Sequence, residues 1–194
     1  MVKFSILVMS VPSRIRSFTP CLLEELERQV NSYSNPEEVE ILCLYDNKRR
    51  SVGEKRNSML GIANGGYLAF VDDDDRVSPS YVSSIMEKIN EGRSPDCIVF
   101  DCICTIDNGP ERYCKYGIEF QPNNLITDTE WEGKPAHTMV WSTRLATKHS
   151  FPDLKAGEDF GWVNEAWPDI KSQSRIEEVL YYYDFNHSTT ETRN

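Results

Sequence analysis

Apolar runs alternate with amphipathic segments along the first half of the chain. Short runs rich in β-branched and large apolar residues predict buried strands, and apolar positions at helical spacing predict helices between them. The predicted strands are 3–11, 39–45, 67–71 and 96–101, and the predicted helices are 17–30, 53–63 and 80–90. This alternation predicts an α/β fold with a parallel or mostly parallel sheet wound on both faces.

The pattern changes after Cys102. Residues 102–130 mix short strand-like pieces with turn residues, so we predict an irregular lobe or hairpin there. The remaining predicted elements are a strand at 138–142, a short helix at 143–149, a helix at 157–167 and an aromatic strand at 176–185. No internal repeat or low-complexity segment interrupts this order.

Four carboxylates, Asp72 to Asp75, follow directly on the strand at 67–71. Adjacent like charges repel, and in open α/β sheets ligands gather where strands end and loops meet helix starts. Hard oxygen ligands at such a place suit Mg²⁺ or Mn²⁺ shared with substrate phosphates. The alternative is a solvated acidic turn. An EF-hand is disfavoured, because Arg76 stands where a third alternating oxygen ligand should be.

Three further groups of polar residues lie at predicted strand ends or helix starts. Asp46 is followed by a basic group that an anionic phosphate ligand would need, although a solvated helix face explains it equally well. Glu158 and Asp159 stand at a helix start, where carboxylates also complement the helix dipole. His187 follows the last predicted strand and could bind metal or lie on the surface. The basic group comprises Lys48, Arg49, Arg50, Lys55 and Arg56.

Charge and cysteine usage exclude several classes of protein. The 21 basic and 31 acidic residues give a net charge of −10, so nucleic acid is not expected as a partner. The six cysteines include no Cys-x-x-Cys pair and only three histidines accompany them, which argues against structural zinc. No apolar run approaches the length of a membrane span. We therefore predict a cytoplasmic protein without an integral membrane segment.

The order of these features resembles the GT-A glycosyltransferases, specifically the inverting family 2. The resemblance rests on Asp46 after a strand, Arg56-Asn57, the acidic run with its preceding Phe70-Val71 and trailing Pro79, and Gly157-Glu158-Asp159. It implies a GT-A, Rossmann-like three-layer α/β/α fold with a mostly parallel central sheet. It also implies one catalytic domain over 1–194, with a nucleotide-binding half at 1–101 and an acceptor-side half at 102–194.

The resemblance also implies roles for individual residues. A nucleotide-sugar-binding group would contain Asp46 at the nucleotide base, Lys55 and Arg56 near the nucleotide, Asp72 toward the ribose or a metal-bound water, and Asp73. Asp74 would bind Mn²⁺ or Mg²⁺ directly, and His187 would complete the coordination. Asp159, or else Glu158, would be the general base. The first strand departs from the family pattern, because it ends Met9-Ser10-Val11-Pro12-Ser13-Arg14, so the base pocket is expected to be built differently.

The implied activity is a metal-dependent, inverting transfer of a sugar from a nucleoside diphosphate sugar, with UDP favoured, to a hydroxyl of a glycan or other acceptor. Four alternatives remain open at this stage. One is a non-catalytic module that binds nucleotide sugars within a larger protein, and another is a sugar nucleotidyltransferase, which the lack of a Gly-rich loop near the first strand disfavours. The others are a retaining transferase, which only the Gly157-Glu158-Asp159 match disfavours, and a structural protein with an acidic surface. The donor sugar is not identified. His137 and Trp141 could shape its pocket or be ordinary packing residues.

Overall fold

A computed structural model describes residues 1–120, 124–188 and 190. The strands are β1 (Phe4–Ser10), β2 (Val39–Tyr45), β3 (Tyr67–Asp72), β4 (Arg76–Val77), β5 (Cys97–Ile106), β6 (Arg112–Tyr116), β7 (Asn124–Leu125), β8 (Glu130–Gly133), β9 (Val140–Ser142) and β10 (Gln173–Phe185). The helices are α1 (Thr19–Ser32), α2 (Val52–Leu60), α3 (Tyr81–Asn90), α4 (Thr143–Ala146) and α5 (Glu158–Ala166), with short 3-10 turns at Pro36–Glu38 and Trp167–Asp169.

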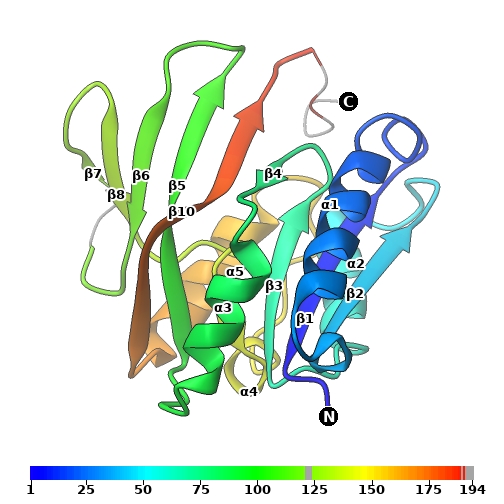
Figure 1. The fold of residues 1–194 in the computed structure, drawn as a ribbon. Coiled ribbons are helices and arrows are strands. Elements are labelled where there is room, and N and C mark those ends of the chain that lie inside the picture. The colour runs from blue at the N-terminus through cyan, green and yellow to red at the C-terminus, as the bar shows by residue number, and fades with distance from the viewer. Residues whose placement is uncertain (121–123, 189, 191–194) are drawn as a thin grey trace.

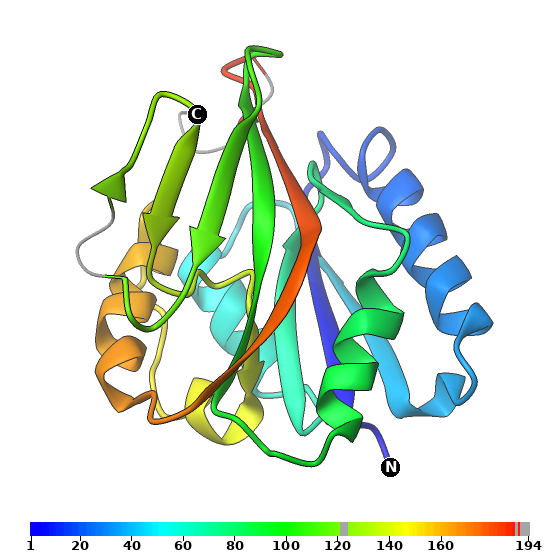
Figure 2. The same ribbon diagram turned by 60° about the vertical axis from the view of Figure 1, so that its left-hand side comes forward.

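A single sheet lies between two layers of helices (Figures 1 and 2). Helices α1 and α3 cover one face, and α2, α4 and α5 cover the other. Its order is β2-β1-β3-β9-β5-β6-β8-β7, and β10 runs beside β5 and also pairs with β4. The pairs β1–β2, β1–β3, β5–β10 and β6–β8 are parallel, whereas β9 is antiparallel to both of its neighbours. The predicted three-layer α/β fold is confirmed.

Of the two forms predicted for residues 102–130, an irregular lobe or a hairpin, the structure shows a hairpin. Strand β5 continues to Ile106 and forms an antiparallel hairpin with β6, which in turn pairs with β8. Of the predicted irregular lobe at 102–130, residues 121–123 lie outside the described part. The predicted boundary after residue 101 falls inside β5, and the division into two halves stays a prediction.

The core explains why the central strands read as apolar runs. In β1 and β3 the side chains of Ile6, Leu7, Leu68 and Phe70 are all fully buried, because helices cover both faces. None of the helices in the described residues is both long and apolar enough to cross a membrane. All six cysteines are free.

The start of α2 lies against the loop that leads to α5. The amide of Gly53 donates a hydrogen bond of 3.2 Å to the carbonyl of Leu154, and a Cβ at position 53 would lie 1.9 Å from the carbonyl oxygen of Pro152. Only glycine therefore permits this approach of two backbones. The contact matters for the site, since α2 and this loop carry residues that meet in the cavity described below.

We expect Gly53→Ala to lower the free energy of unfolding by about 1–3 kcal/mol, measured by equilibrium urea unfolding. Alanine favours a helix by about 1 kcal/mol over glycine, so the steric clash with Pro152 decides the sign. Gly61→Ala is the control, because Gly61 has φ −72° and its nearest contact would be an ordinary 3.5 Å. That variant should be neutral or slightly stabilising. Equal effects at the two positions would contradict the close approach.

Candidate active site

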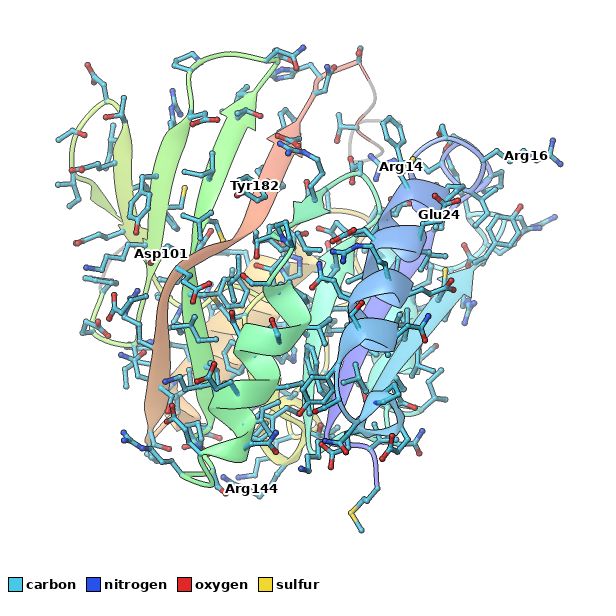
Figure 3. All side chains as sticks on the ribbon, viewed as in Figure 1. Arg14, Arg16, Glu24, Asp101, Arg144 and Tyr182 are labelled. Carbon is cyan, nitrogen blue, oxygen red and sulfur yellow. The ribbon has the colours of Figure 1, made fainter. Side chains whose placement is uncertain are left out.

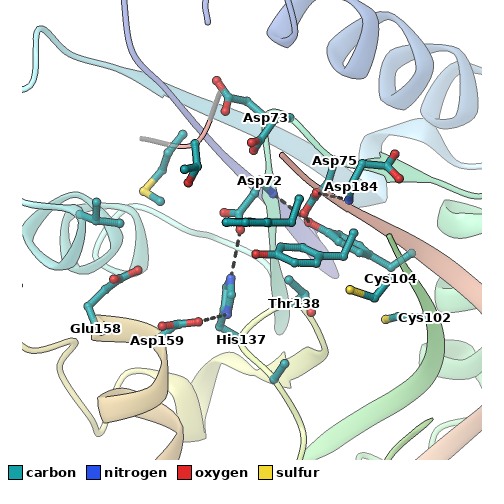
Figure 4. Close-up of a pocket in the computed structure, with 18 of the residues that line it drawn as sticks. Asp72, Asp73, Asp75, Cys102, Cys104, His137, Thr138, Glu158, Asp159 and Asp184 are labelled. Atoms are coloured by element: carbon teal, nitrogen blue, oxygen red, sulfur yellow. Dashed lines mark hydrogen bonds and ion pairs between the residues drawn. The ribbon is translucent and has the colours of Figure 1, made fainter. Parts of the chain in front are cut away.

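A cavity of about 500 Å³ opens at the carboxyl ends of β1 and β3. One wall carries the acidic run after β3, and the facing wall carries the start of α5 (Figure 4). Helix α2 contributes Lys55 and Arg56 to the same cavity. The position agrees with the rule that ligands of open α/β sheets bind beyond the carboxyl ends of the strands.

His137 joins the two acidic walls. Its Nε2 lies 3.4 Å from Oδ2 of Asp72 and its Nδ1 lies 3.4 Å from Oδ2 of Asp159, as Figure 4 shows. Arg56 forms a second connection, with Nη2 at 3.1 Å from Oδ1 of Asp72 and Nε at 3.0 Å from Oε1 of Glu158. His137 and Asp159 lie 65 and 87 positions after Asp72 along the chain, and the structure holds all three in one network of charges.

This network controls the ionisation of its members. Burial disfavours a charged imidazole, and Arg56 adds to this, but the hydrogen bonds to Asp159 and Asp72 raise the pKa of His137 to about 9. Burial likewise opposes ionisation of both carboxyls. His137 nevertheless lowers the pKa of Asp159 to about 2, and Arg56 with His137 lowers the pKa of Asp72. At neutral pH the site therefore holds an imidazolium between two carboxylates.

Because the folded-state pKa of His137 lies above that of a free histidine, protonation of His137 stabilises the fold. This contribution is complete below about pH 6.5 and is lost as the pH rises through about 9. We expect the free energy of unfolding of the metal-free protein to fall by on the order of 3 kcal/mol over this window. Urea unfolding at a series of pH values measures it. His137→Gln should lack this part of the pH dependence, and an equal fall in both proteins would contradict the assignment.

The other three aspartates have partners within the protein. Arg14 lies 3.0 Å from Asp73 and 2.7 Å from Asp74, and Thr19 donates a 3.0 Å hydrogen bond to Asp73. Asp75 accepts hydrogen bonds from the Tyr181 hydroxyl, at 2.6 Å, and from the amide of Asp184. Counter-ions and hydrogen-bond donors within the protein thus already reduce the repulsion among the four carboxylates, which a bound cation was expected to relieve.

Ionisation of Asp74 and Asp75 still carries an electrostatic cost. Burial is the main cause that raises the pKa of Asp74 to about 6, and the neighbouring Asp72 and Asp73 add to it, whereas Arg14 opposes it. Burial and Asp72 also raise the pKa of Asp75 well above its usual range. A divalent cation at this wall would lower this electrostatic cost.

The donor set suits Mg²⁺ or Mn²⁺ only if substrate supplies part of the coordination. In the described residues no three histidine, cysteine or acidic side chains gather as a metal-binding group. Asp72 and Asp74 line the cavity, and Mg²⁺ is commonly held by one or two carboxylates together with substrate phosphates. The residues therefore fit a cation that is shared with a diphosphate.

Of the predicted site residues Lys55 and Asp46, which lie close together, only Lys55 lines the cavity. Lys55 lines the cavity, with its Nζ 3.7 Å from Oδ1 of Asp46. Asp46 itself lies at the end of β2, where Arg50 and the amide of Lys48 bind its carboxylate, and it is not among the residues that line the cavity.

His187 lies apart from the acidic run. Its Nδ1 contacts Asp107, its ring packs on Phe185, and its side chain is 46% exposed. It does not line the cavity. The structure thus does not bring His187 to Asp74, and its role as a metal ligand stays a prediction without geometric support.

The two candidate bases at the start of α5 have different surroundings. Glu158 is 6% exposed and is bound to Arg56, whereas Asp159 is 40% exposed at the cavity. Gly157, with φ +79°, precedes them in the left-handed conformation that favours glycine and lets the helix begin at this point. Only Asp159 of the two combines ionisation with access to a ligand.

Sequence reasoning missed the aromatic wall on the side of β6, β8 and β10. Tyr116 and Trp131 form an edge-to-face pair at 5.2 Å, and Tyr183 stacks beside Phe185 at 6.2 Å. All four line the cavity. Trp141, by contrast, is fully buried and packs on Trp162, which makes it a core residue.

Comparison with family models gives one match. The model of the family described as "Glycosyl transferase family 2" matches residues 24–153. No curated protein matches the chain.

Several solved structures share the fold. The crystal structure of S. aureus TarS has a TM-score of 0.64 at 20% identity, covering 94% of this chain and 37% of that one. TarS 1-349 in complex with UDP has a TM-score of 0.65 at 19% identity, covering 94% of this chain and 60% of that one. TarS 1-349 in complex with UDP-GlcNAc has a TM-score of 0.64 at 19% identity, covering 94% of this chain and 58% of that one. The chain therefore spans 60% or less of these neighbours.

Proposed function

Since the chain belongs to glycosyl transferase family 2, we propose that it transfers a sugar from a nucleoside diphosphate sugar to a hydroxyl of a glycan acceptor, with inversion and with a divalent cation. The observation that carries this proposal is the pairing of two walls in one cavity. Asp72 and Asp74 lie on the first and Asp159 on the second, with His137 between them. UDP is the nucleotide we favour, because the structural neighbour TarS is described in complex with UDP and UDP-GlcNAc.

The first wall is suited to the leaving group. Asp74, with Asp72, would hold Mn²⁺ or Mg²⁺, and the bound cation would supply positive charge where negative charge develops on the departing diphosphate. Lys55 lines the same cavity and would add a fixed positive charge. Arg56 is committed to Asp72 and Glu158, so we assign it to positioning those carboxylates.

Asp159 would be the general base. Its carboxylate is ionised and accessible, so it can accept the proton of the acceptor hydroxyl as that oxygen attacks the anomeric carbon. The bond from the anomeric carbon to the diphosphate oxygen breaks with its electron pair leaving on the phosphate. A single displacement from the opposite face inverts the anomeric configuration. Glu158 is the weaker candidate, because Arg56 and burial hold it away from the acceptor.

The aromatic wall is the proposed acceptor side. Tyr116, Trp131 and Tyr183 line the cavity, and an aromatic surface of this kind suits the C–H face of a sugar ring. The acceptor's identity, the cytoplasmic location and the parts of a longer protein that such a domain could serve all stay predictions.

The experiment is a thermal-shift panel of UDP, GDP, CDP and dTDP, each with and without Mn²⁺, followed by turnover of UDP-GlcNAc and other UDP sugars. We expect the largest stabilisation with UDP plus Mn²⁺ and release of UDP over time. The anomeric coupling constant of the product, measured by proton NMR, reports inversion.

Each alternative gives a different result in these assays. A binding module would be stabilised but would release no UDP, and a nucleotidyltransferase would release pyrophosphate from a nucleoside triphosphate and a sugar phosphate. Absence of any metal-dependent shift would overturn the proposed site at Asp72 and Asp74.

A further inference from the structure

Arg14 contacts the acidic run and also lines the cavity. It lies in the loop between β1 and α1, and its side chain is 12% exposed. Its Nη1 lies 2.8 Å from Oδ1 of Asp74 and its Nη2 lies 2.7 Å from Oδ2, so the guanidinium binds both carboxylate oxygens. The same Nη1 lies 3.0 Å from Asp73. This bidentate geometry is the strongest form of such a pair.

A cation at Asp74 and this guanidinium would repel each other at close range. Both would sit within a few ångströms of the same carboxylate, in a partly buried place where charges are weakly screened. Arg14 also lines the cavity that would receive the donor diphosphate. A guanidinium fork fits phosphate oxygens as well as it fits a carboxylate.

We propose that Arg14 and the divalent cation exchange on Asp74: the cation takes the carboxylate when the donor diphosphate enters, and Arg14 turns from Asp74 to the phosphates. The inference rests on the proposed function. It makes Arg14 a diphosphate-binding residue, and it makes cation binding depend on the nucleotide. Without a diphosphate, the cation must displace Arg14 with no phosphate to receive the guanidinium. With one, Arg14 keeps a partner, and the two ligands assist each other to the same degree.

The test is a Mn²⁺ titration followed by the electron paramagnetic resonance signal of free Mn²⁺, with and without UDP. Wild-type protein should bind Mn²⁺ at least tenfold more tightly with UDP. Arg14→Gln should bind Mn²⁺ at least tenfold more tightly than wild type without UDP, and UDP should improve this affinity much less. Loss of a basic residue that tightens binding of a cation without UDP separates exchange at Asp74 from a general effect on folding.

Arg16→Gln is the matched control. Arg16 belongs to the same loop but is exposed, and Figure 3 shows it pointing away from the molecule. The Arg16→Gln substitution removes the same charge from the loop as Arg14→Gln does. Because Arg16 points away from the molecule, this substitution should leave both Mn²⁺ titrations unchanged. Asp74→Asn should abolish tight Mn²⁺ binding in the wild-type and the Arg14→Gln backgrounds.

Removing Arg14 leaves Asp73 and Asp74 without their guanidinium, so thermal unfolding of each variant is recorded alongside. If Arg14→Gln does not fold, Arg14→Lys serves in its place. A lysine keeps the charge without the fork, and it should give a Mn²⁺ affinity above that of wild type when UDP is absent.

Three outcomes would overturn the exchange. These are unchanged Mn²⁺ affinity in the Arg14 variant, equal tightening in Arg16→Gln, and wild-type Mn²⁺ binding that ignores UDP. In each of them turnover of a UDP sugar with release of UDP can persist, so the proposed function survives. Absence of both UDP and Mn²⁺ binding by wild-type protein would instead remove the proposed function, and the exchange with it.

Discussion

Sugar transfer by Asp159→Asn is expected to be roughly 100- to 10,000-fold slower than by the wild-type protein, the range that a positioned general base contributes. An amide is similar in shape to a carboxylate but cannot accept the acceptor's proton. The residues proposed to bind the donor, Asp72, Asp74 and Lys55, line the same cavity and are unchanged in this variant. Affinity for UDP plus Mn²⁺, measured by calorimetry, should therefore stay within a few-fold of wild type. The rate is measured as UDP released in the presence of acceptor.

Asp169→Asn provides a matched control for this variant. Asp169 is 48% exposed and also contacts a histidine, with 3.2 Å between its Oδ2 and Nε2 of His149, but it is not among the residues that line the cavity. It should transfer sugar at the wild-type rate. Full activity in Asp159→Asn would remove Asp159 as the base. Glu158→Gln would then be the next variant to assay.

The largest effect on stability is expected at Arg56. Arg56→Met should lower the free energy of unfolding by about 3–5 kcal/mol, because it leaves buried acidic groups without their counter-ion. Glu158 is 6% exposed, and Asp72 would retain only His137 on this side of the network. The substitution also removes a cation–π contact in which the guanidinium carbon lies 4.9 Å from the Phe70 ring centre. Equilibrium urea unfolding at pH 7 measures the loss.

Two comparisons separate this explanation from loss of a generic arginine. Arg28→Met removes an arginine that is 54% exposed and paired with Glu25, and it should change stability little. Adding Glu158→Gln to Arg56→Met should recover part of the loss, since it removes one of the two stranded charges. If the double variant is less stable than Arg56→Met alone, the buried-charge explanation is wrong.

The predicted α/β fold is confirmed, and so is the family that the motifs resemble. Local periodicity is the reason that the α/β fold could be predicted. In β1 and β3, apolar runs report burial between two helical layers, and in α1 and α3 helical spacing reports a single buried face. Strand ends then place Asp72 and its neighbours at one edge of the sheet. The later part of the chain was less readable, because β5, β6 and β8 are stabilised by pairing between strands whose partners the local pattern does not identify.

The candidate site shows the same division. Asp72, Asp74, Arg56 and Asp159 could be selected from sequence because each stands at a strand end or a helix start beside a matching motif, and the structure brings all four to the network or the cavity. Arg14 lies four residues after the end of β1, but its partners Asp73 and Asp74 lie 59 and 60 positions away along the chain.

His137 could not be selected in this way. It is a single histidine in a weakly patterned stretch, and its importance comes from two carboxylates that approach it from different elements.

The sequence by itself determined most of the strands and helices up to residue 101, the place of the acidic run after β3, and the family. Periodicity and short motifs are properties of neighbouring residues, and they survive without knowledge of the fold. Only the tertiary structure decided which charges neutralise which. Arg14 meets Asp73 across 59 positions, and Arg56 meets Glu158 across 102. Coulomb interactions depend on distance in space and on burial, and neither quantity is written in the order of residues along the chain.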